Sequence, residues 1–223
     1  IPQIALSRPE ALFGGLPVQL HRPLPVLRNA FALLSELGLL EHPGAARLLG
    51  SLDEQTRSVT ATMIEHGINS PRTSSMGRLF DAAAAILGIC DKATYEGEPA
   101  IELEAAAWRA FSSESACPTG NMASFSVTES SRPDDFHVLN SRPLFEALLE
   151  GIRTGVPAGK LALDFHVTIA RASARIASEI CVREDLDTVA LSGGVFMNRL
   201  LLQLLTHELK DAGLAVLVPH PVP

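Results

Sequence analysis

Hydrophobic and polar positions near the carboxy-terminal end of the chain follow the order of a buried strand, a turn and a helix. The apolar run at 189–191 has the length of a buried strand. Ser192, Gly193 and Gly194 then interrupt this run, and leucines at helical spacing follow. Since glycines let a ligand approach the backbone, and the first N–H groups of a helix are free, this turn could bind an anion. The same pattern also fits an ordinary turn in an α/β core, and both interpretations stay open.

Most of the remaining chain carries apolar residues at helical spacing. This spacing predicts helices over 27–40, 45–49, 51–67, the later part of 73–88, 99–110, 141–155 and 157–182. Short strands are predicted over 18–20, 123–128, 135–139 and 214–218, of which the middle two form a hairpin. Strands alternate with helices only toward the end of the chain, which indicates a helix-rich α/β fold.

The helix predicted over 51–67 has recognisable signals at both ends. Ser51 and Glu54 have the spacing of a capping box, so the helix is expected to begin after Ser51. Gly67 is expected to end it, because glycine readily adopts the backbone conformation that follows a helix. One face of this helix carries Val59, Met63 and Ile64.

The segment 73–88 combines a serine-rich loop with a strongly apolar helix. Ser74 or Ser75 could cap this helix, and Gly77 allows a neighbour or a ligand to approach the backbone closely. Asp81 lies among alanines and large apolar residues. It is either an ordinary helix residue, solvated or paired with Arg78, or a carboxylate with a function.

Two further groups of polar residues also allow two interpretations each. Glutamates gather around the start of the helix predicted over 99–110, at Glu96, Glu98, Glu102 and Glu104. They either stabilise the helix, because carboxylates interact favourably with its positive amino-terminal end, or accept hydrogen bonds from sugar hydroxyls. His166 lies alone on an apolar helix, where a structural role is the more common one and a functional role stays open.

Composition excludes several classes of protein. Hydrophobic residues make up 47% of the 223 residues and charged residues 19%, so a sizeable core is expected. The net charge of −7 and the absence of a basic tract argue against nucleic-acid and anionic-membrane partners. No apolar run is long enough to cross a bilayer, and three widely separated cysteines fit a reducing cytoplasm. The chain begins at Ile1 and ends in a loop-like segment, so it is expected to be a piece of a longer protein.

Motifs of common catalytic and metal sites are missing from the sequence. No two of the seven histidines have the spacing of a helical metal pair, and the cysteines form no Cys-x-x-Cys motif. Neither a phosphate-binding Gly-x-x-x-x-Gly-Lys loop nor a Gly-x-Ser-x-Gly elbow occurs. The sequence therefore assigns no catalytic residue and no metal ligand in this chain.

Three motifs together resemble a known family. They are Thr73-Ser-Ser-Met-Gly-Arg-Leu-Phe-Asp-Ala-Ala-Ala-Ala-Ile-Leu-Gly88, Tyr95-Glu-Gly-Glu-Pro-Ala-Ile-Glu-Leu-Glu104 and Ser192-Gly-Gly-Val-Phe-Met-Asn-Arg199. In this order they resemble the carboxy-terminal part of HypF-type hydrogenase maturation carbamoyltransferases. That part is shared with tRNA threonylcarbamoyl-adenosine enzymes and antibiotic O-carbamoyltransferases. The resemblance begins at about residue 60, and the acidic charge and the Tyr-Glu-Gly-Glu-Pro loop favour the HypF type.

The resemblance implies a fold and a reaction. The fold is part of an actin-like, sugar-kinase-like (ASKHA) two-lobe α/β fold, with an amino-terminal arm and helical subdomain over 1–72 and a nucleotide-binding lobe over 73–223. The reaction is ATP-dependent carbamoyl transfer from carbamoyl-adenylate, made from carbamoyl phosphate and ATP, to the carboxy-terminal Cys of a small HypE-type partner protein. The implied nucleotide-binding residues are Ser75, Gly77, Asp81, Gly97, Glu98, Gly193, Gly194 and Asn198. The Phe165-His166 pair also resembles the family's Phe-His, which implies a place close to the floor of the cleft.

Departures from the family pattern leave alternatives open. The family holds a divalent metal, iron or zinc, through a His-x-x-x-His pair upstream and an Asp of an Asn-Asp-Gly-Gly segment downstream, and neither motif occurs here. A metal is therefore expected only in a full-length protein, and the isolated chain is expected to be inactive. Met76 stands where the family often has Cys, and Glu98 where Gln is common. Alternatives are a tRNA threonylcarbamoyl or small-molecule O-carbamoyltransferase, or a non-catalytic interaction module.

Overall fold

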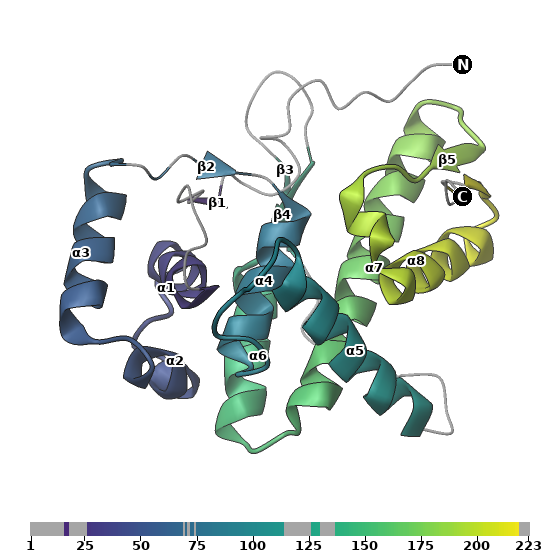
Figure 1. Ribbon diagram of the computed structural model, residues 1–223. Coiled ribbons are helices and arrows are strands. Elements are labelled where there is room, and N and C mark those ends of the chain that lie inside the picture. The colour runs from purple at the N-terminus through teal and green to yellow at the C-terminus, as the bar shows by residue number, and fades with distance from the viewer. Residues whose placement is uncertain are drawn as a thin grey trace.

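The computed structural model describes residues 16–17, 26–68, 70, 72–73, 75–113, 126–129 and 137–218. Helices dominate this part of the chain (Figure 1). They are α1 (Val26–Glu36), α2 (Ala46–Gly50), α3 (Glu54–Glu65), α4 (Met76–Ile86), α5 (Glu98–Ser113), α6 (Arg142–Arg153), α7 (Ala158–Arg183) and α8 (Arg199–Asp211), with 3-10 turns η2 (Pro43–Ala45) and η3 (Gly194–Met197).

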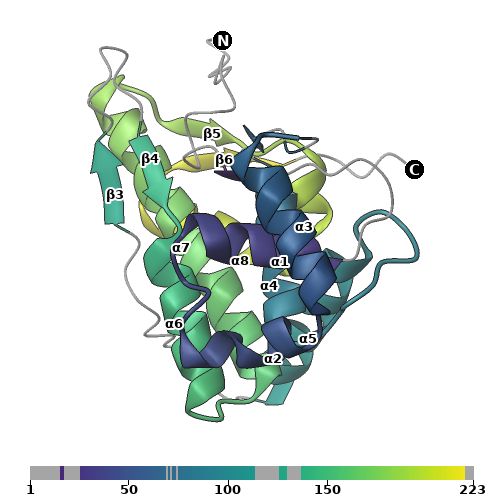
Figure 2. The ribbon, with the colours of Figure 1, turned by 90° about the vertical axis from the view of Figure 1, so that its left-hand side faces the viewer.

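The strands are short and pair in twos. β1 (Leu16–Pro17) pairs antiparallel with β2 (Arg72–Thr73), and β3 (Ser126–Glu129) pairs antiparallel with β4 (His137–Asn140). β5 (Thr188–Ala190) and β6 (Ala215–Leu217) pair in parallel, and β6 contacts α8 (Figures 1 and 2). The described residues therefore form a helix-rich domain with a small parallel sheet, which confirms the α/β prediction at this level.

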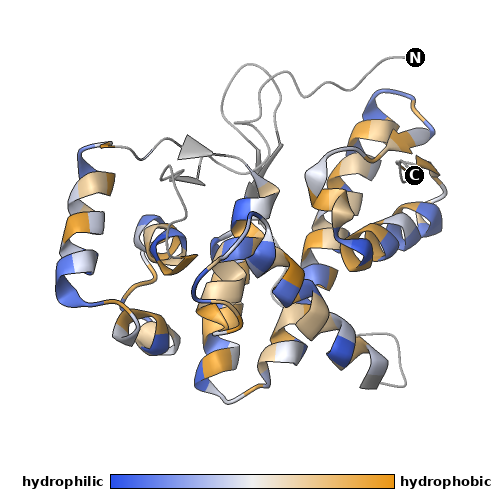
Figure 3. Ribbon diagram, in the orientation of Figure 1, coloured by the Kyte–Doolittle hydropathy of each residue, from blue (hydrophilic) through white to orange (hydrophobic). Residues whose placement is uncertain are grey.

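Helix α4 lies at the centre of the hydrophobic core. Its four consecutive alanines, 82–85, are almost completely buried, and α4 contacts α1 on one side and α5 on the other. Small side chains let these helices approach closely, while Phe80 fills the remaining space against Phe165 of α7. Hydrophobic colours predominate along α4 in Figure 3. Burying a side chain such as Phe80 stabilises the fold by about 1.5–3 kcal/mol.

The long helix α7 connects this core to the parallel sheet. It contacts α5 and α8 along its length, and ten consecutive residues at 161–170 are buried. Residues of α1 and α4 belong to the same hydrophobic cluster, so α1 packs directly on the predicted nucleotide-binding lobe. The boundary between 72 and 73 stays a prediction. No helix among the described residues has the length and apolar character needed to span a membrane.

Most predicted elements are confirmed, and the differences have local causes. The helix predicted over 27–40 ends at Glu36, and the strand predicted at 18–20 lies outside the described residues. The capping-box prediction was wrong: Asp53 accepts a hydrogen bond from the Thr56 N–H at 2.6 Å and caps α3. Ser51 follows α2 instead, and its hydroxyl donates to the carbonyl of Arg47.

The apolar residues of α3 are only weakly buried. Val59 is 47% exposed, and Met63 and Ile64 are only partly buried. Thr60 is the buried residue of this helix, and its hydroxyl donates to the carbonyl of Thr56. Helix α3 therefore packs on the core through a narrow edge, which contacts α1. The helix nevertheless ends as predicted, since Gly67 adopts a positive φ of 64°.

Candidate functional site

The buried imidazole of His166 connects three helices. Its ring packs edge-on against Phe80 of α4, with ring centroids 5.1 Å apart. Nδ1 lies 2.7 Å from the carbonyl oxygen of Ala162, and Nε2 lies 3.0 Å from the amide nitrogen of Asn198. Since a carbonyl only accepts, Nδ1 carries the proton and Nε2 accepts from Asn198. Burial lowers the pKa of His166 to about 4, so the ring is neutral near pH 7.

Asn198 forms the cap of α8 and contributes both ends of its amide to the fold. Its Oδ1 accepts a hydrogen bond from the Leu201 N–H at 2.8 Å, while its amide nitrogen donates to His166. The residue is only 9% exposed. An amide has two N–H donors and two acceptor lone pairs, so one of each remains after these contacts. The structure thus fixes the orientation of Asn198, and its predicted contact with a nucleotide stays a prediction.

A carboxylate of α5 covers the remaining N–H groups at the start of α8. Oε1 of Glu104 accepts hydrogen bonds from the N–H groups of Arg199 at 2.8 Å and Leu200 at 3.1 Å. With the Leu201 N–H bound by Asn198, the first three N–H groups of α8 all have partners. Of the two interpretations left open by the sequence, these contacts argue against an anion bound by the N–H groups of α8 itself. The positive end of the helix is neutralised by the chain's own carboxylate.

The turn before α8 still has open backbone groups. Gly193 adopts a positive φ of 112°, and the N–H groups of Gly193, Gly194 and Val195 have no hydrogen-bond partner among the described residues. Both glycines are exposed, and a Cβ added at either would meet no described atom within 4 Å. An anion could therefore approach this turn, which precedes α8 in the chain.

Gly97 and Gly77 differ in what the fold requires of them. Gly97 has a positive φ of 84°, so the turn before α5 demands a glycine there. Gly77 lies in the first turn of α4 and has an ordinary helical φ. A Cβ at this position would meet only the hydroxyl of Ser75, at 3.6 Å, which is a normal contact. Packing among the described residues therefore does not explain why Gly77 lacks a side chain.

Asp81 is a buried carboxylate that forms an ion pair. The residue is 7% exposed, and its Oδ2 accepts a hydrogen bond from the Arg78 guanidinium at 3.0 Å. Burial raises the pKa of the Asp81 carboxyl, and the neighbouring Arg78 opposes this rise. Pairing with Arg78 is thus confirmed, and the interpretation as a solvated residue is wrong. Asp81 follows Phe80, which packs on His166, and α4 also contacts η3.

Ser75 and Glu98 occupy the starts of α4 and α5. Ser75 stands at the cap position of α4, but its hydroxyl does not make the capping hydrogen bond, and Ser74 lies outside the described residues. Glu98 accepts hydrogen bonds from the N–H and the hydroxyl of Thr94, which lower the pKa of its carboxyl. Glu98 therefore closes the loop before α5. Ligand contacts of both residues stay predictions.

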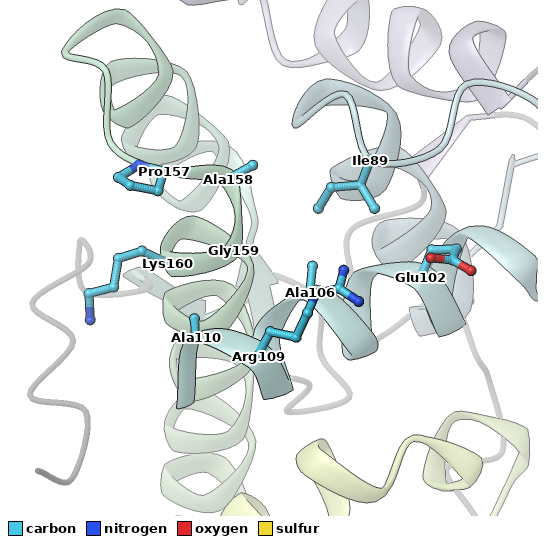
Figure 4. A pocket seen from close by; sticks show the side chains of 9 residues that line it. All are labelled: Ile89, Glu102, Ala106, Arg109, Ala110, Pro157, Ala158, Gly159 and Lys160. Atoms are coloured by element: carbon cyan, nitrogen blue, oxygen red, sulfur yellow. The ribbon is translucent and has the colours of Figure 1, made fainter. Parts of the chain in front are cut away.

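A pocket of about 620 Å³ lies between α5 and the start of α7 (Figure 4). Its lining residues are Ile89, Glu102, Ala106, Arg109, Ala110, Pro157, Ala158, Gly159 and Lys160. Lys160 extends away from the others in Figure 4 and pairs with Asp164 at 3.1 Å. No predicted nucleotide-binding residue lines this pocket. Within the described residues, no group of three or more His, Cys, Asp or Glu side chains could hold a metal ion.

Comparison with known proteins assigns the family. The family model described as "Carbamoyltransferase, Kae1-like Domain, second subdomain" of HypF matches residues 21–223. The chain belongs to this HypF carbamoyltransferase family. It is 38% identical to a "Carbamoyltransferase HypF homolog" of Cupriavidus necator over 172 residues, which are 76% of this chain and 41% of that protein. It is 32% identical to "Carbamoyltransferase HypF" of Rhodobacter capsulatus over 213 residues, 95% of this chain and 25% of that protein.

Solved structures of the family have the same fold. A crystal structure of full-length HypF in its phosphate- and nucleotide-bound form matches with a TM-score of 0.81 at 23% identity, covering 95% of this chain and 26% of that one. The structure of T. kodakarensis HypF matches with a TM-score of 0.70 at 29% identity, over 94% of this chain and 26% of that one. The present chain thus spans about a quarter of the length of these full-length proteins.

The sequence did not reveal how two side chains organise the start of α8. Glu104 was noticed only as one member of an acidic cluster, and His166 as a histidine that is either structural or, by resemblance, close to the floor of the cleft. The spacing of Glu104 and Trp108 is a weak signal, since residues four apart on a helix meet, and Trp108 Nε1 donates to Glu104 at 3.3 Å. The decisive partners, Arg199 and Leu200, are backbone groups 95 and 96 residues away, which no local pattern reveals.

Proposed function

We propose that this chain is the nucleotide-binding part of a longer, cytoplasmic HypF-type carbamoyltransferase. In the reaction, the thiolate of a carboxy-terminal Cys on a HypE-type partner attacks the carbamoyl carbon of carbamoyl-adenylate. The bond to the phosphate breaks, and AMP leaves as the carbamoyl group is joined to sulfur. Family membership supports this proposal, as does the likeness to a HypF structure that holds phosphate and nucleotide. In the full-length protein the chain would form part of an ASKHA two-lobe fold.

The observation that carries the proposal is the arrangement of α4 and α8 around His166. Phe80 and Asn198 contact the same imidazole, and Asp81 follows Phe80 directly. Residues from two distant motifs are thereby held on neighbouring elements, as a shared site requires. Asp81 would accept hydrogen bonds from ribose hydroxyls, and Asn198 would use its remaining amide groups on the ribose or base. Gly97 would let the sugar approach the backbone closely.

Phosphate groups would be bound by the turn before α8. The N–H groups of Gly193, Gly194 and Val195 have no partner among the described residues, whereas those of Arg199, Leu200 and Leu201 do. Successive backbone N–H groups of such a turn form an anion-binding concavity. The described residues hold no group of metal ligands, so no step is assigned to a metal here. These residues would act by positioning the intermediate, which can supply several kcal/mol of the barrier reduction.

Calorimetric titration of the full-length protein with ATP tests the proposal. Asp81→Ala is expected to weaken binding by about 1–3 kcal/mol, the usual effect of removing a buried charged hydrogen-bond partner. Asp91→Ala is the matched control, because Asp91 also pairs with an arginine, Arg47 at 3.0 Å, but lies beyond the far end of α4. Unchanged affinity in a folded Asp81→Ala variant would refute the nucleotide site. Failure of the wild-type protein to bind ATP would favour a non-catalytic interaction module.

A further inference from the structure

Glu104 occupies the place where the start of a helix would bind an anion. Its carboxylate comes from the middle of α5 and reaches the first two N–H groups of α8 at 2.8 and 3.1 Å. The Trp108 indole N–H donates to the same oxygen at 3.3 Å. Three donors therefore converge on one carboxylate oxygen. Hydrogen bonds to an ionised acceptor are about twice as strong as neutral ones, so this contact ties α8 firmly to α5.

The first turn of α8 is held from two sides. On the α7 side, His166 accepts from the amide of Asn198 at 3.0 Å. On the α5 side, Glu104 holds the N–H groups of Arg199 and Leu200, the two residues that follow Asn198. Since α5 begins at Glu98, directly after Gly97, one rigid helix links the two predicted nucleotide-binding segments.

We propose that Glu104 is a positioning residue of the nucleotide site. It sets the distance between the start of α5 and the turn that precedes α8, and thereby the width of the site, without touching the nucleotide. The proposal rests on the proposed function, because it concerns the same site. The proposal also explains why a carboxylate lies at the positive end of α8. Because Glu104 already binds the N–H groups there, a bound phosphate can use only the N–H groups of the glycine turn.

Amide hydrogen exchange in the nucleotide-free 223-residue chain tests the contact itself. In Glu104→Ala, protection of the Arg199 and Leu200 amides is expected to fall by about tenfold or more. Emission from Trp108, the single tryptophan of the chain, is expected to shift as well. Glu104→Gln keeps an acceptor oxygen at the same position and should restore part of the protection. Glu146→Gln is the control, since Glu146 is a paired carboxylate on α6. Unchanged protection in Glu104→Ala would overturn the contact.

ATP titration of the full-length protein tests the positioning role. Glu104→Ala is expected to weaken binding about tenfold, with Glu104→Gln intermediate and Glu146→Gln like the wild type. A purely structural role predicts a lower melting temperature with unchanged affinity in the folded variant, and that result would overturn the proposal. If the wild type itself does not bind ATP, the proposed function and the positioning role fall together. The exchange measurement would then still decide whether Glu104 holds α8.

Discussion

Protonation of His166 is expected to destabilise the fold as the pH falls. The folded state holds the ring neutral with a pKa of about 4, whereas the unfolded chain protonates it near the ordinary histidine pKa of 6.5. Between these values the unfolded state binds more protons, so stability is lost as the pH falls from 6.5 toward 4. The difference between these two pKa values corresponds to about 3 kcal/mol, and burial is its main cause.

Urea unfolding of the 223-residue chain at a series of pH values measures this loss. Other groups also titrate in this window, so the quantity of interest is the difference between the wild type and His166→Gln. Glutamine does not titrate, and its carbonyl oxygen can still accept from Asn198. The wild type should be stabilised relative to the variant by about 3 kcal/mol more at pH 7 than at pH 4. His207→Gln is the control, because His207 is an exposed histidine of α8.

A difference that stays constant from pH 7 to pH 4 would refute this reasoning. It would mean either that the ring is already charged in the folded state or that it has access to water. A charged ring could not accept from Asn198 through Nε2, so the orientation assigned to the Asn198 amide would fall with it. The result therefore also tests the geometry on which the candidate site depends.

Three further predictions concern stability and metal content. Asp81→Asn should leave the free energy of unfolding at pH 7 within about 1 kcal/mol of the wild type, because burial disfavours the charge that is removed, yet it should weaken ATP binding. Gly193→Ala should destabilise the fold by about 1–2 kcal/mol because of its φ of 112°, and Gly194→Ala far less. Elemental analysis of the 223-residue chain, purified without chelator, should find no stoichiometric iron or zinc.

Each of these predictions has a clear contrary result. A large loss of stability in Asp81→Asn would make the carboxylate a structural residue. Equal losses for the two glycine variants would show that space around the turn, and not its backbone conformation, decides stability. One tightly held metal ion per chain, lost on mutation of a histidine, would contradict the expectation that a metal binds only in a longer protein.

Periodicity predicted the longest helix well. The helix expected over 157–182 corresponds to α7. Its apolar residues recur at helical spacing over many turns, and a pattern of this length is typical of a helix. The apolar run at 189–191 similarly corresponds to β5 followed by buried Leu191. The predicted start of α3 was wrong because Ser51 and Asp53 are both residues that can cap a helix. Helix α2 runs to Gly50, so Ser51 lies at the end of that helix, and Asp53 caps the start of α3.

Residues of the candidate site were harder to predict because their roles depend on distant partners. The resemblance implied Asp81 and Asn198 as nucleotide-binding residues and placed His166 near the floor of the cleft, but it did not show that this imidazole contacts both Phe80 and Asn198. Local pattern also suggested free N–H groups at α8. Whether such groups are free depends on the tertiary structure, since Glu104 approaches from a helix nearly a hundred residues earlier in the chain.

The two carboxylates of the candidate site, Glu104 and Asp81, differ in the contacts that hold them. Glu104 receives three hydrogen bonds and neutralises the start of α8, so it acts on the site through the position of α8 and not through contact with a ligand. Among the described residues, Asp81 accepts a hydrogen bond from Arg78 alone, and its raised pKa means that the folded state disfavours its charge. A buried charge that weakens the fold is more readily explained by binding than by packing. With the helix terminus already closed by Glu104, a nucleotide would therefore place its sugar toward Asp81 and its phosphates at the open glycine turn.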